Sequence, residues 1–286
     1  MEGSLTEKGV IYFLTSCSDV QPKEAPSHAL LLVVSLWSLR KHYSGRVAIL
    51  ATHELSAWVK SQILEGPELG RGSFVWGVDL VQMRRNSAHV TKTALHRSTP
   101  FDVSIFIDAD TLPVADPSPL FDLCTPEKPL VLTHFAGWTV GKEKGVVRKR
   151  IKTFADAAGR LDLFEQCVGS EAINTGVYAF RKTSTLLEPA FELCKRGFNK
   201  FIPDECAWQL LFKHHPHVML EDEYNYSPLY SKGTPKIWHA HGSKVLAPRI
   251  KDAWLGALRE VWEGNVGNVR KWLPERDRKT YVELLK

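Results

Sequence analysis

The first half of this 286-residue chain alternates short, wholly apolar runs with longer segments of helical periodicity. The apolar runs predict strands at Val10–Thr15, Arg46–Thr52, Asp79–Met83 and Val103–Ile107. The segments between them predict helices at His28–His42, Glu54–Leu64 and His89–Ser98. Strands that are apolar throughout and alternate with helices indicate a mostly parallel central sheet covered on both faces. We therefore predict a Rossmann-like α/β fold, in which ligands gather at the carboxyl ends of the strands.

The second half of the chain is less regular. It predicts strands at Leu130–His134 and Gly176–Arg181, and helices at Gly145–Ala158 and Thr185–Lys195. After Pro248 the pattern becomes wholly helical, with Trp254, Leu258 and Val261 at helical spacing. The expected organisation is a domain over residues 1–247 and a helical C-terminal extension over residues 248–286.

The composition of the chain indicates which kind of partner and which cellular compartment to expect. The net charge of +5 suits a polyanionic substrate, but the basic residues form no single block, which argues against nucleic acid. The N-terminus is polar and no run of about 18 apolar residues occurs, so we expect neither a signal peptide nor a membrane span. The five cysteines contain no CxxC pair and predict reduced thiols in a cytoplasmic protein without a zinc site: Cys17, Cys124, Cys167, Cys194 and Cys206.

The most informative segment is Ile105–Thr111, in which two acids follow a buried strand. Residues i and i+2 of a strand point to the same side, so Asp108 and Asp110 are expected side by side across Ala109. Two adjacent carboxylates repel each other unless a cation lies between them. A divalent metal such as Mn²⁺ or Mg²⁺ would supply that cation and would also bind diphosphate oxygens. The alternative is a turn in which both acids cap backbone amides.

Three neighbouring segments, Thr91–His96, Phe101–Asp110 and Thr111–Asp122, resemble the glycogenin family and its bacterial lipopolysaccharide glycosyltransferase relatives. The resemblance implies a GT-A-type fold in which Asp108 and Asp110 coordinate Mn²⁺ on the diphosphate of a UDP-sugar. It also implies that the nucleotide sugar contacts the helix and the strand exits, at Lys92, Ala109, Thr15 and Ser16. A solvated helix face is the alternative for Lys92.

Two further segments resemble sugar-contacting parts of that family. Ala172–Phe180 resembles its N-S/T-G-V strand, where Asn174 would contact the sugar and Gly176 would let the backbone approach a ligand. The alternative is a turn that enters a strand. Pro203–Gln209 resembles a segment that carries an Asp-Gln pair, but Glu205 replaces the glutamine beside Asp204. Asp204 would otherwise be a helix N-cap.

Lys236–Lys244 resembles the family's H-x-x-G-x-x-K-P-W segment. The resemblance implies that His239 is the third metal ligand and that Gly242 and Lys244 hold the diphosphate. Lys244 comes one residue early and the Pro-Trp pair is missing. Because imidazole suits manganese better than magnesium, His239 favours Mn²⁺. A structural role for His239 is the alternative.

Together these features predict a metal-dependent glycosyltransferase. It would transfer a hexose from a UDP-sugar to a carbohydrate or other hydroxyl acceptor, with retention as the resemblance implies. The expected catalytic residues are Asp108, Asp110, Asn174 and Asp204.

Three other readings stay open. A catalytically inactive sugar-binding or scaffolding domain would keep the fold without the activity. A nucleotidyltransferase would carry a glycine-rich basic loop after the first strand, which LTSCSDVQPK lacks. Basic residues among Trp254, Trp262 and Trp272 could make a peripheral membrane contact, unless those rings pack against the core.

Overall fold

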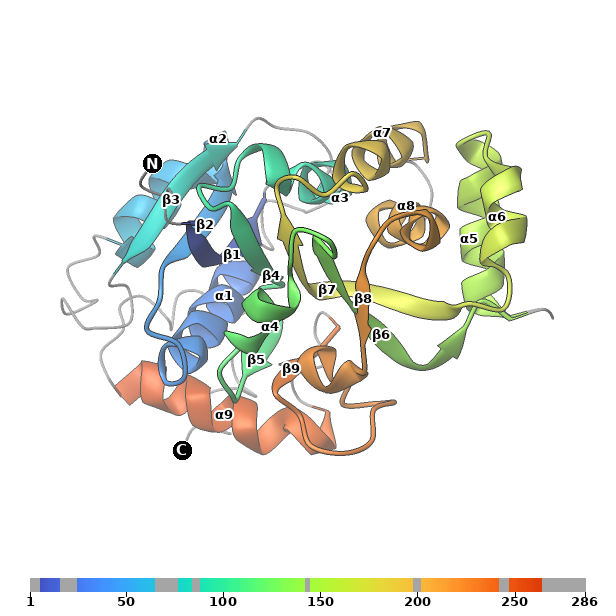
Figure 1. The fold of residues 1–286 in the computed structure, drawn as a ribbon. Helices are drawn as coiled ribbons and strands as arrows, with labels where there is room; N and C mark the ends of the chain where they lie inside the picture. Colours follow the sequence, from blue (N-terminus) through green and yellow to red (C-terminus); the bar gives the residue numbers. More distant parts are fainter. Residues whose placement is uncertain are drawn as a thin grey trace.

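A seven-stranded sheet in the order β3-β2-β1-β4-β7-β6-β8 forms the centre of the molecule (Figure 1). The structure is a computed structural model and describes residues 6–15, 25–64, 77–83, 88–141, 145–197, 202–241 and 247–263. The strands of this sheet are β1 (Lys8–Leu14), β2 (Val47–Thr52), β3 (Val78–Met83), β4 (Val103–Ile107), β6 (Leu130–Thr139), β7 (Glu171–Arg181) and β8 (Val218–Leu220). Neighbouring strands run parallel except where β7 pairs with β4 and β6. The predicted mostly parallel α/β sheet is confirmed.

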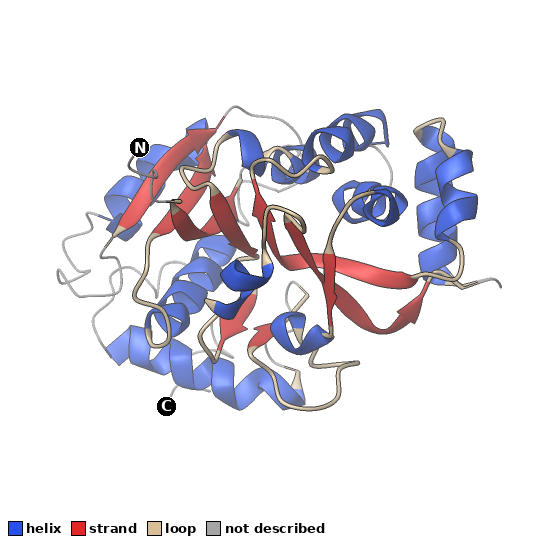
Figure 2. Ribbon diagram, in the orientation of Figure 1, coloured by secondary structure: helices blue, strands red, loops and turns tan. Residues whose placement is uncertain are grey.

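A second, two-stranded sheet consists of β5 (Thr111–Pro113) and β9 (Ile237–His239), which pair antiparallel. The helices are α1 (Ala25–Arg40), α2 (His53–Val59, continued by a π-helix over Lys60–Leu64), α3 (Ala88–Thr93), α4 (Pro119–Leu123), α5 (Val146–Ala157), α6 (Leu161–Cys167), α7 (Leu187–Gly197), α8 (Pro203–Leu211) and α9 (Pro248–Glu263). In Figure 1, α1 and α9 lie below the sheet and α3, α7 and α8 above it. Figure 2 shows the same layering of helices around the strands.

The central strands bury both of their faces, as their uniformly apolar sequences predict. In β1, Val10 and Tyr12 belong to the core cluster shared with α1, α2 and α9, whereas Ile11 between them belongs to the cluster shared with α3 and α5 to α8. All three side chains are 0% exposed. The alternation of side chains along a strand thus divides the core into two layers.

Most of the predicted elements are present, and their bounds differ by a few residues. The strand β7 begins at Glu171, five residues before its predicted start, so that Asn174 to Gly176 lie inside the strand. The alternative of a turn at that point is wrong. The elements β5, β8, α4 and α6, which were not predicted, are at most seven residues long. Segments so short carry little periodicity, which is why the sequence pattern misses them.

The predicted C-terminal helix begins at Pro248 and packs against α1. Trp254, Leu258 and Val261 are at most 1% exposed and belong to the same core cluster as the strands. Trp37 also donates a hydrogen bond from Nε1 to Glu260 over 2.9 Å. Trp254 is therefore a core residue, and the rest of the predicted extension, 264–286, lies outside the described residues. The division at residue 247 stays a prediction.

None of the described helices combines the length and the apolar character that crossing a lipid bilayer requires. The four cysteines that the structure describes are free and buried, as expected: Cys124, Cys167, Cys194 and Cys206. Cys17 lies outside the described residues.

Candidate active site

The two acids lie on a tight turn between β4 and β5. The Asp108 N–H donates to the Gly176 carbonyl over 2.8 Å, which continues the pairing of β4 with β7 by one bond. The chain then turns, and Thr111 donates to the Asp108 carbonyl from both its N–H (3.2 Å) and its Oγ1 (2.8 Å). The expectation that the acids share one side of a strand is therefore wrong in detail. A turn, and not strand periodicity, brings Asp108 and Asp110 together.

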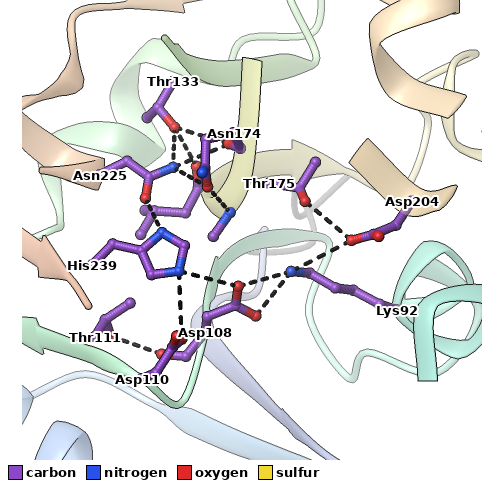
Figure 3. Close-up of polar contacts among 12 residues, drawn as sticks. Lys92, Asp108, Asp110, Thr111, Thr133, Asn174, Thr175, Asp204, Asn225 and His239 are labelled. Atoms are coloured by element: carbon purple, nitrogen blue, oxygen red, sulfur yellow. Dashed lines mark hydrogen bonds and ion pairs between the residues drawn. The ribbon is translucent and has the colours of Figure 1, made fainter. Parts of the chain in front are cut away.

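His239 reaches the acids because β9 pairs with β5. Thr111 and His239 are direct partners in that ladder, and the Ala240 N–H donates to the Asp110 carbonyl over 2.9 Å. The His239 Nε2 atom lies 3.5 Å from Asp110 Oδ1 and 3.8 Å from Asp108 Oδ2 (Figure 3). Residues more than a hundred positions apart thus meet at the carboxyl end of β4.

The spacing of these three side chains fits a divalent ion. Each of Asp108, Asp110 and His239 offers one ligand atom, and these atoms all lie within 4.8 Å of one another. Two ligands bonded to one ion at about 2.1 Å are roughly 3 to 4.2 Å apart, so small side-chain movements suffice to close the site. The structure brings the three predicted ligands together, and their role as ligands remains a prediction.

Asn225 determines which nitrogen of His239 faces the acids. Its Oδ1 lies 2.7 Å from the His239 Nδ1, and an amide oxygen can only accept, so Nδ1 carries the proton. The Asn225 amide nitrogen in turn donates to Thr133 Oγ1 (2.7 Å) and to the Asn174 Oδ1 (3.0 Å). When the ring is neutral, Nε2 is therefore the nitrogen that presents its lone pair to the two carboxylates. Histidines that ligate metals commonly have such a partner on the other ring nitrogen.

The cluster attracts positive charge. Burial lowers the pKa of His239, but the carboxylates of Asp110 and Asp108 outweigh burial, and the pKa stands above its ordinary value. Burial also raises the pKa of Asp108 against the opposing effect of Lys92. A proton or a metal ion would relieve this accumulation of buried negative charge.

Gly176 on β7 gives the His239 ring its room. A Cβ atom built at Gly176 would overlap Cε1 and Nδ1 of that imidazole. The expected close approach at this glycine is therefore made by a side chain of the protein itself. Asn174, 6% exposed, accepts hydrogen bonds at Oδ1 from the Gly176 N–H (2.8 Å) and from Asn225.

Lys92 on α3 points into the same site. Its Nζ donates to both carboxylate oxygens of Asp108, over 2.8 and 2.9 Å, and lies 3.6 Å from the Asp204 Oδ2. Its side chain is only 13% exposed, so the alternative of a solvated helix face is wrong. Burial lowers the pKa of Lys92, but Asp108 and Asp204 outweigh burial and raise it. The lysine is a cation held against two acids.

Asp204 lies in the first turn of α8 but is not its N-cap, which is Ile202. Its carboxylate instead accepts hydrogen bonds from His89 Nδ1 (2.7 Å) and Thr175 Oγ1 (3.1 Å). Burial raises the pKa of Asp204, but the hydrogen bond and charge of His89 outweigh burial, so the pKa is well below its ordinary value. Asp204 is an ionised acid, and the capping alternative is wrong.

Glu205 has a weaker partner than its neighbour. Arg150 Nη1 lies 3.6 Å from its Oε1, and the glutamate side chain is 19% exposed. Burial and the charge of Asp204 raise the pKa of Glu205 to about 7.

These groups line one cavity of about 460 Å³, within the size range of small-molecule sites. Thr15 and Ala109, both expected to contact the donor, line it together with Lys92, Asp204 and Glu205. Ser16, Gly242 and Lys244 lie outside the described residues.

Three residues of the site were not predicted from the sequence. His89 precedes Lys92 by three positions on one helix, so helical spacing could have found it. Thr133 and Asn225 carry no such signal, because only the folded chain brings them to His239.

No model of a known protein family matches the chain, and no curated protein is significantly similar to it in sequence. Solved structures do match. Glycosyltransferase GlyE of Streptococcus pneumoniae TIGR4 is 16% identical, with a TM-score of 0.57 over 97% of this chain and 64% of its own. The galactosyltransferase LgtC in complex with donor and acceptor sugar analogues is 10% identical, with a TM-score of 0.56 over 90% and 99%.

This chain has a GT-A-type fold. Mouse xyloside xylosyltransferase 1 shares it as well, at 12% identity and a TM-score of 0.52 over 83% of this chain and 98% of its own. The chain spans 64% of the length of the GlyE chain. At these identities the likeness concerns the fold, and what the chain does has to be argued from the site.

Proposed function

We propose that this chain is a metal-dependent glycosyltransferase that transfers a hexose from a UDP-sugar to an acceptor hydroxyl. The observation that carries the proposal is the group of Asp108, Asp110 and His239 at the carboxyl end of a GT-A-type sheet. In open α/β sheets, ligands bind outside the carboxyl ends of the strands, and the cavity lies there.

The proposed metal ligands are Asp108, Asp110 and His239, with Mn²⁺ favoured over Mg²⁺ because one ligand is a nitrogen. When bound, the ion supplies charge neutralisation for the departing diphosphate. The residues prepare its site in three ways. The turn at Asp108 fixes the first acid, β5–β9 pairing fixes the histidine, and Asn225 orients the lone pair of Nε2.

For the donor, we assign the nucleotide to the exit of β1 at Thr15 and Ser16 and to Ala109, and the diphosphate to Gly242 and Lys244. Lys92, which lines the same cavity, would also contact the donor. The LgtC complex with donor and acceptor sugar analogues supports a nucleotide-sugar donor and a carbohydrate acceptor for a chain of this fold.

Near the reacting carbon, we assign Asn174 and Asp204 as the groups that position the hexose, and neither as a covalent nucleophile. The ionised Asp204 stands beside Lys92 and Thr175 and could accept hydrogen bonds from sugar hydroxyls. Retention of anomeric configuration is part of the proposal, and proton NMR of the first product formed tests it directly.

The experiment that tests the function is a panel of nucleotide sugars assayed for hydrolysis and transfer, with Mn²⁺ and with EDTA. We expect Mn²⁺-dependent turnover that Asp110→Ala lowers by about 10²–10³-fold, because the departing charge loses a stabilising partner. Asp122→Ala is the matched control, since the Asp122 side chain is 83% exposed and pairs with Lys8 at the surface. Turnover by Asp110→Ala at the parent rate would refute the proposal, and donor binding without turnover would indicate an inactive binding domain.

A further inference from the structure

Three aromatic side chains form a cluster beside the candidate active site. Phe135 and Trp138 come from the outer part of β6, and Tyr230 comes from the segment between β8 and β9. The ring centroids lie 5.8 Å apart for Phe135 and Trp138, 5.8 Å for Phe135 and Tyr230, and 5.7 Å for Trp138 and Tyr230. Each ring thus contacts both others. We call Phe135, Trp138 and Tyr230 the aromatic cluster.

The aromatic cluster is continuous with the proposed metal centre. The ring of His241 lines the cavity and stands 4.2 Å from the ring of His239 and 5.4 Å from that of Phe135, measured between centroids. Two ring contacts therefore separate the proposed metal ligand from Phe135.

The segment that carries Tyr230 is held in one conformation by internal hydrogen bonds. The Ser227 N–H donates to Ser231 Oγ over 2.8 Å, and the Ser231 N–H donates back to the Ser227 carbonyl over 3.1 Å. Both serines are 1% exposed. Arg249 Nη1 donates to the Ser231 carbonyl over 2.6 Å, and the Tyr226 hydroxyl donates to the Gly233 carbonyl over 2.8 Å. These hydrogen bonds hold the backbone at both ends of the turn.

The hydrogen-bonded turn that carries Tyr230 exposes apolar surface. Of the large apolar side chains that the structure describes, five are exposed, and Leu229 and Tyr230, each 44% exposed, are neighbours on the turn. Phe135 and Trp138 are half-buried beside them. A turn that buries its serines and presents a leucine and a tyrosine to solvent is typical of a binding surface, since exposed apolar groups add nothing to folding.

We propose that the aromatic cluster binds the acceptor, and that the acceptor segment it binds is a carbohydrate. One face of a pyranose carries C–H bonds polarised by the ring oxygens, and the negative face of an aromatic ring attracts them. Tyrosine and tryptophan provide such a surface at small cost in conformational entropy. The proposal rests on the proposed function, because it assigns the second substrate of that reaction.

The test is saturation-transfer NMR with a panel of five probes: lactose, maltose, cellobiose, and the p-nitrophenyl β-glycosides of glucose and galactose. Spectra are recorded for the parent with Mn²⁺ and UDP, and again without both, so that binding is measured apart from turnover. We expect a signal on the C–H face of at least one probe. Tyr230→Ala and Trp138→Ala should each weaken its affinity by about tenfold, because each removes one stacking surface.

The controls separate stacking from damage to the fold. Tyr230→Phe keeps the ring and should bind like the parent, and Leu161→Ala removes an apolar side chain of similar exposure, 41%, on α6. Absence of binding by every probe, or equal affinity of parent and Tyr230→Ala, overturns the proposal. Donor hydrolysis measured on Leu161→Ala should equal that of the parent. Probe binding without any donor hydrolysis would refute the proposed function and leave the carbohydrate site standing.

Discussion

The acids at this end of the sheet differ in how closely they are partnered. Lys92 donates to both oxygens of Asp108, His239 faces Asp110, and His89 donates to Asp204. Glu205 pairs with Arg150, whose Nη1 stands 3.6 Å away. The strength of the hydrogen bonds and ion pairs that each carboxylate accepts decides whether it is ionised. Asp204 has a pKa well below its ordinary value because its hydrogen bonds outweigh burial, whereas burial dominates at Glu205.

The raised pKa of Glu205 gives the folded protein a pH-dependent stability. Between the ordinary value of 4.5 and the folded value of about 7, the native state binds a proton that the unfolded state has lost. This contribution is fully present below the ordinary value and is lost as the pH rises through the folded value. Glu205→Gln removes this pH dependence. As the pH rises from about 5 to about 8 the parent loses stability and the variant does not, so the variant should become more stable relative to the parent by about 1–2 kcal/mol. This stability difference is smaller than the full pKa shift of Glu205 would give, because the side chain is 19% exposed and solvent screens part of the effect.

Urea unfolding of parent and Glu205→Gln at both pH values measures the difference. Glu192→Gln, at an exposed position paired with Lys195, controls for the loss of one negative charge. A parent-to-variant difference that does not depend on pH would show that Glu205 is ionised throughout this range.

At the scale of elements, three strands build the proposed metal centre. β4 delivers Asp108 at its end, β5 continues from the turn, and β9 returns from far along the chain to pair with β5. The strand β7 leaves space for the His239 ring, because Gly176 has no side chain at that point. The position of the imidazole thus depends on a strand that supplies no ligand.

Gly176→Ala should therefore damage the metal site more than the fold. The added methyl group would overlap the His239 imidazole and turn it away from Asp108 and Asp110, and we expect Mn²⁺ affinity to fall by about 10–100-fold. Electron paramagnetic resonance of free Mn²⁺ during a titration gives that affinity. Gly256→Ala in α9 is the control, since a Cβ atom there meets nothing within 4 Å. Equal Mn²⁺ affinity in both variants would contradict the assignment of His239 as a ligand.

The elements also explain which parts of the site could be predicted from the sequence. Asp108 and Asp110 follow an apolar strand, and Lys92 lies on a helix just before it, so local pattern and resemblance together located them. A turn at the acids was the alternative to a strand, and the sequence did not decide between the two, because either can bring Asp108 and Asp110 side by side. Asn225 and Thr133 act on His239 through contacts between residues distant in the sequence, and no single-sequence pattern records such contacts.

At the scale of the whole molecule, the sheet separates two core layers, and α9 closes one of them. Its apolar side chains belong to the cluster that contains Val10 and Tyr12 of β1, and its Glu260 accepts a hydrogen bond from Trp37 of α1. The strands beneath this layer end at the cavity. The helix α9 is therefore part of the core that the sheet builds.

This packing predicts how the protein responds when the helix is weakened. Leu258 is 0% exposed, so Leu258→Ala should lower the free energy of unfolding by about 2–5 kcal/mol through lost burial and the cavity it leaves. Urea unfolding followed by tryptophan fluorescence measures the loss, and Val146→Ala, at a valine that is 66% exposed, should leave stability nearly unchanged. Because the helix covers the core and does not line the cavity, Mn²⁺ affinity of the folded Leu258→Ala protein should equal that of the parent. If Leu258→Ala unfolds like the parent, α9 is a separable extension, and a chain ending at residue 247 should fold by itself.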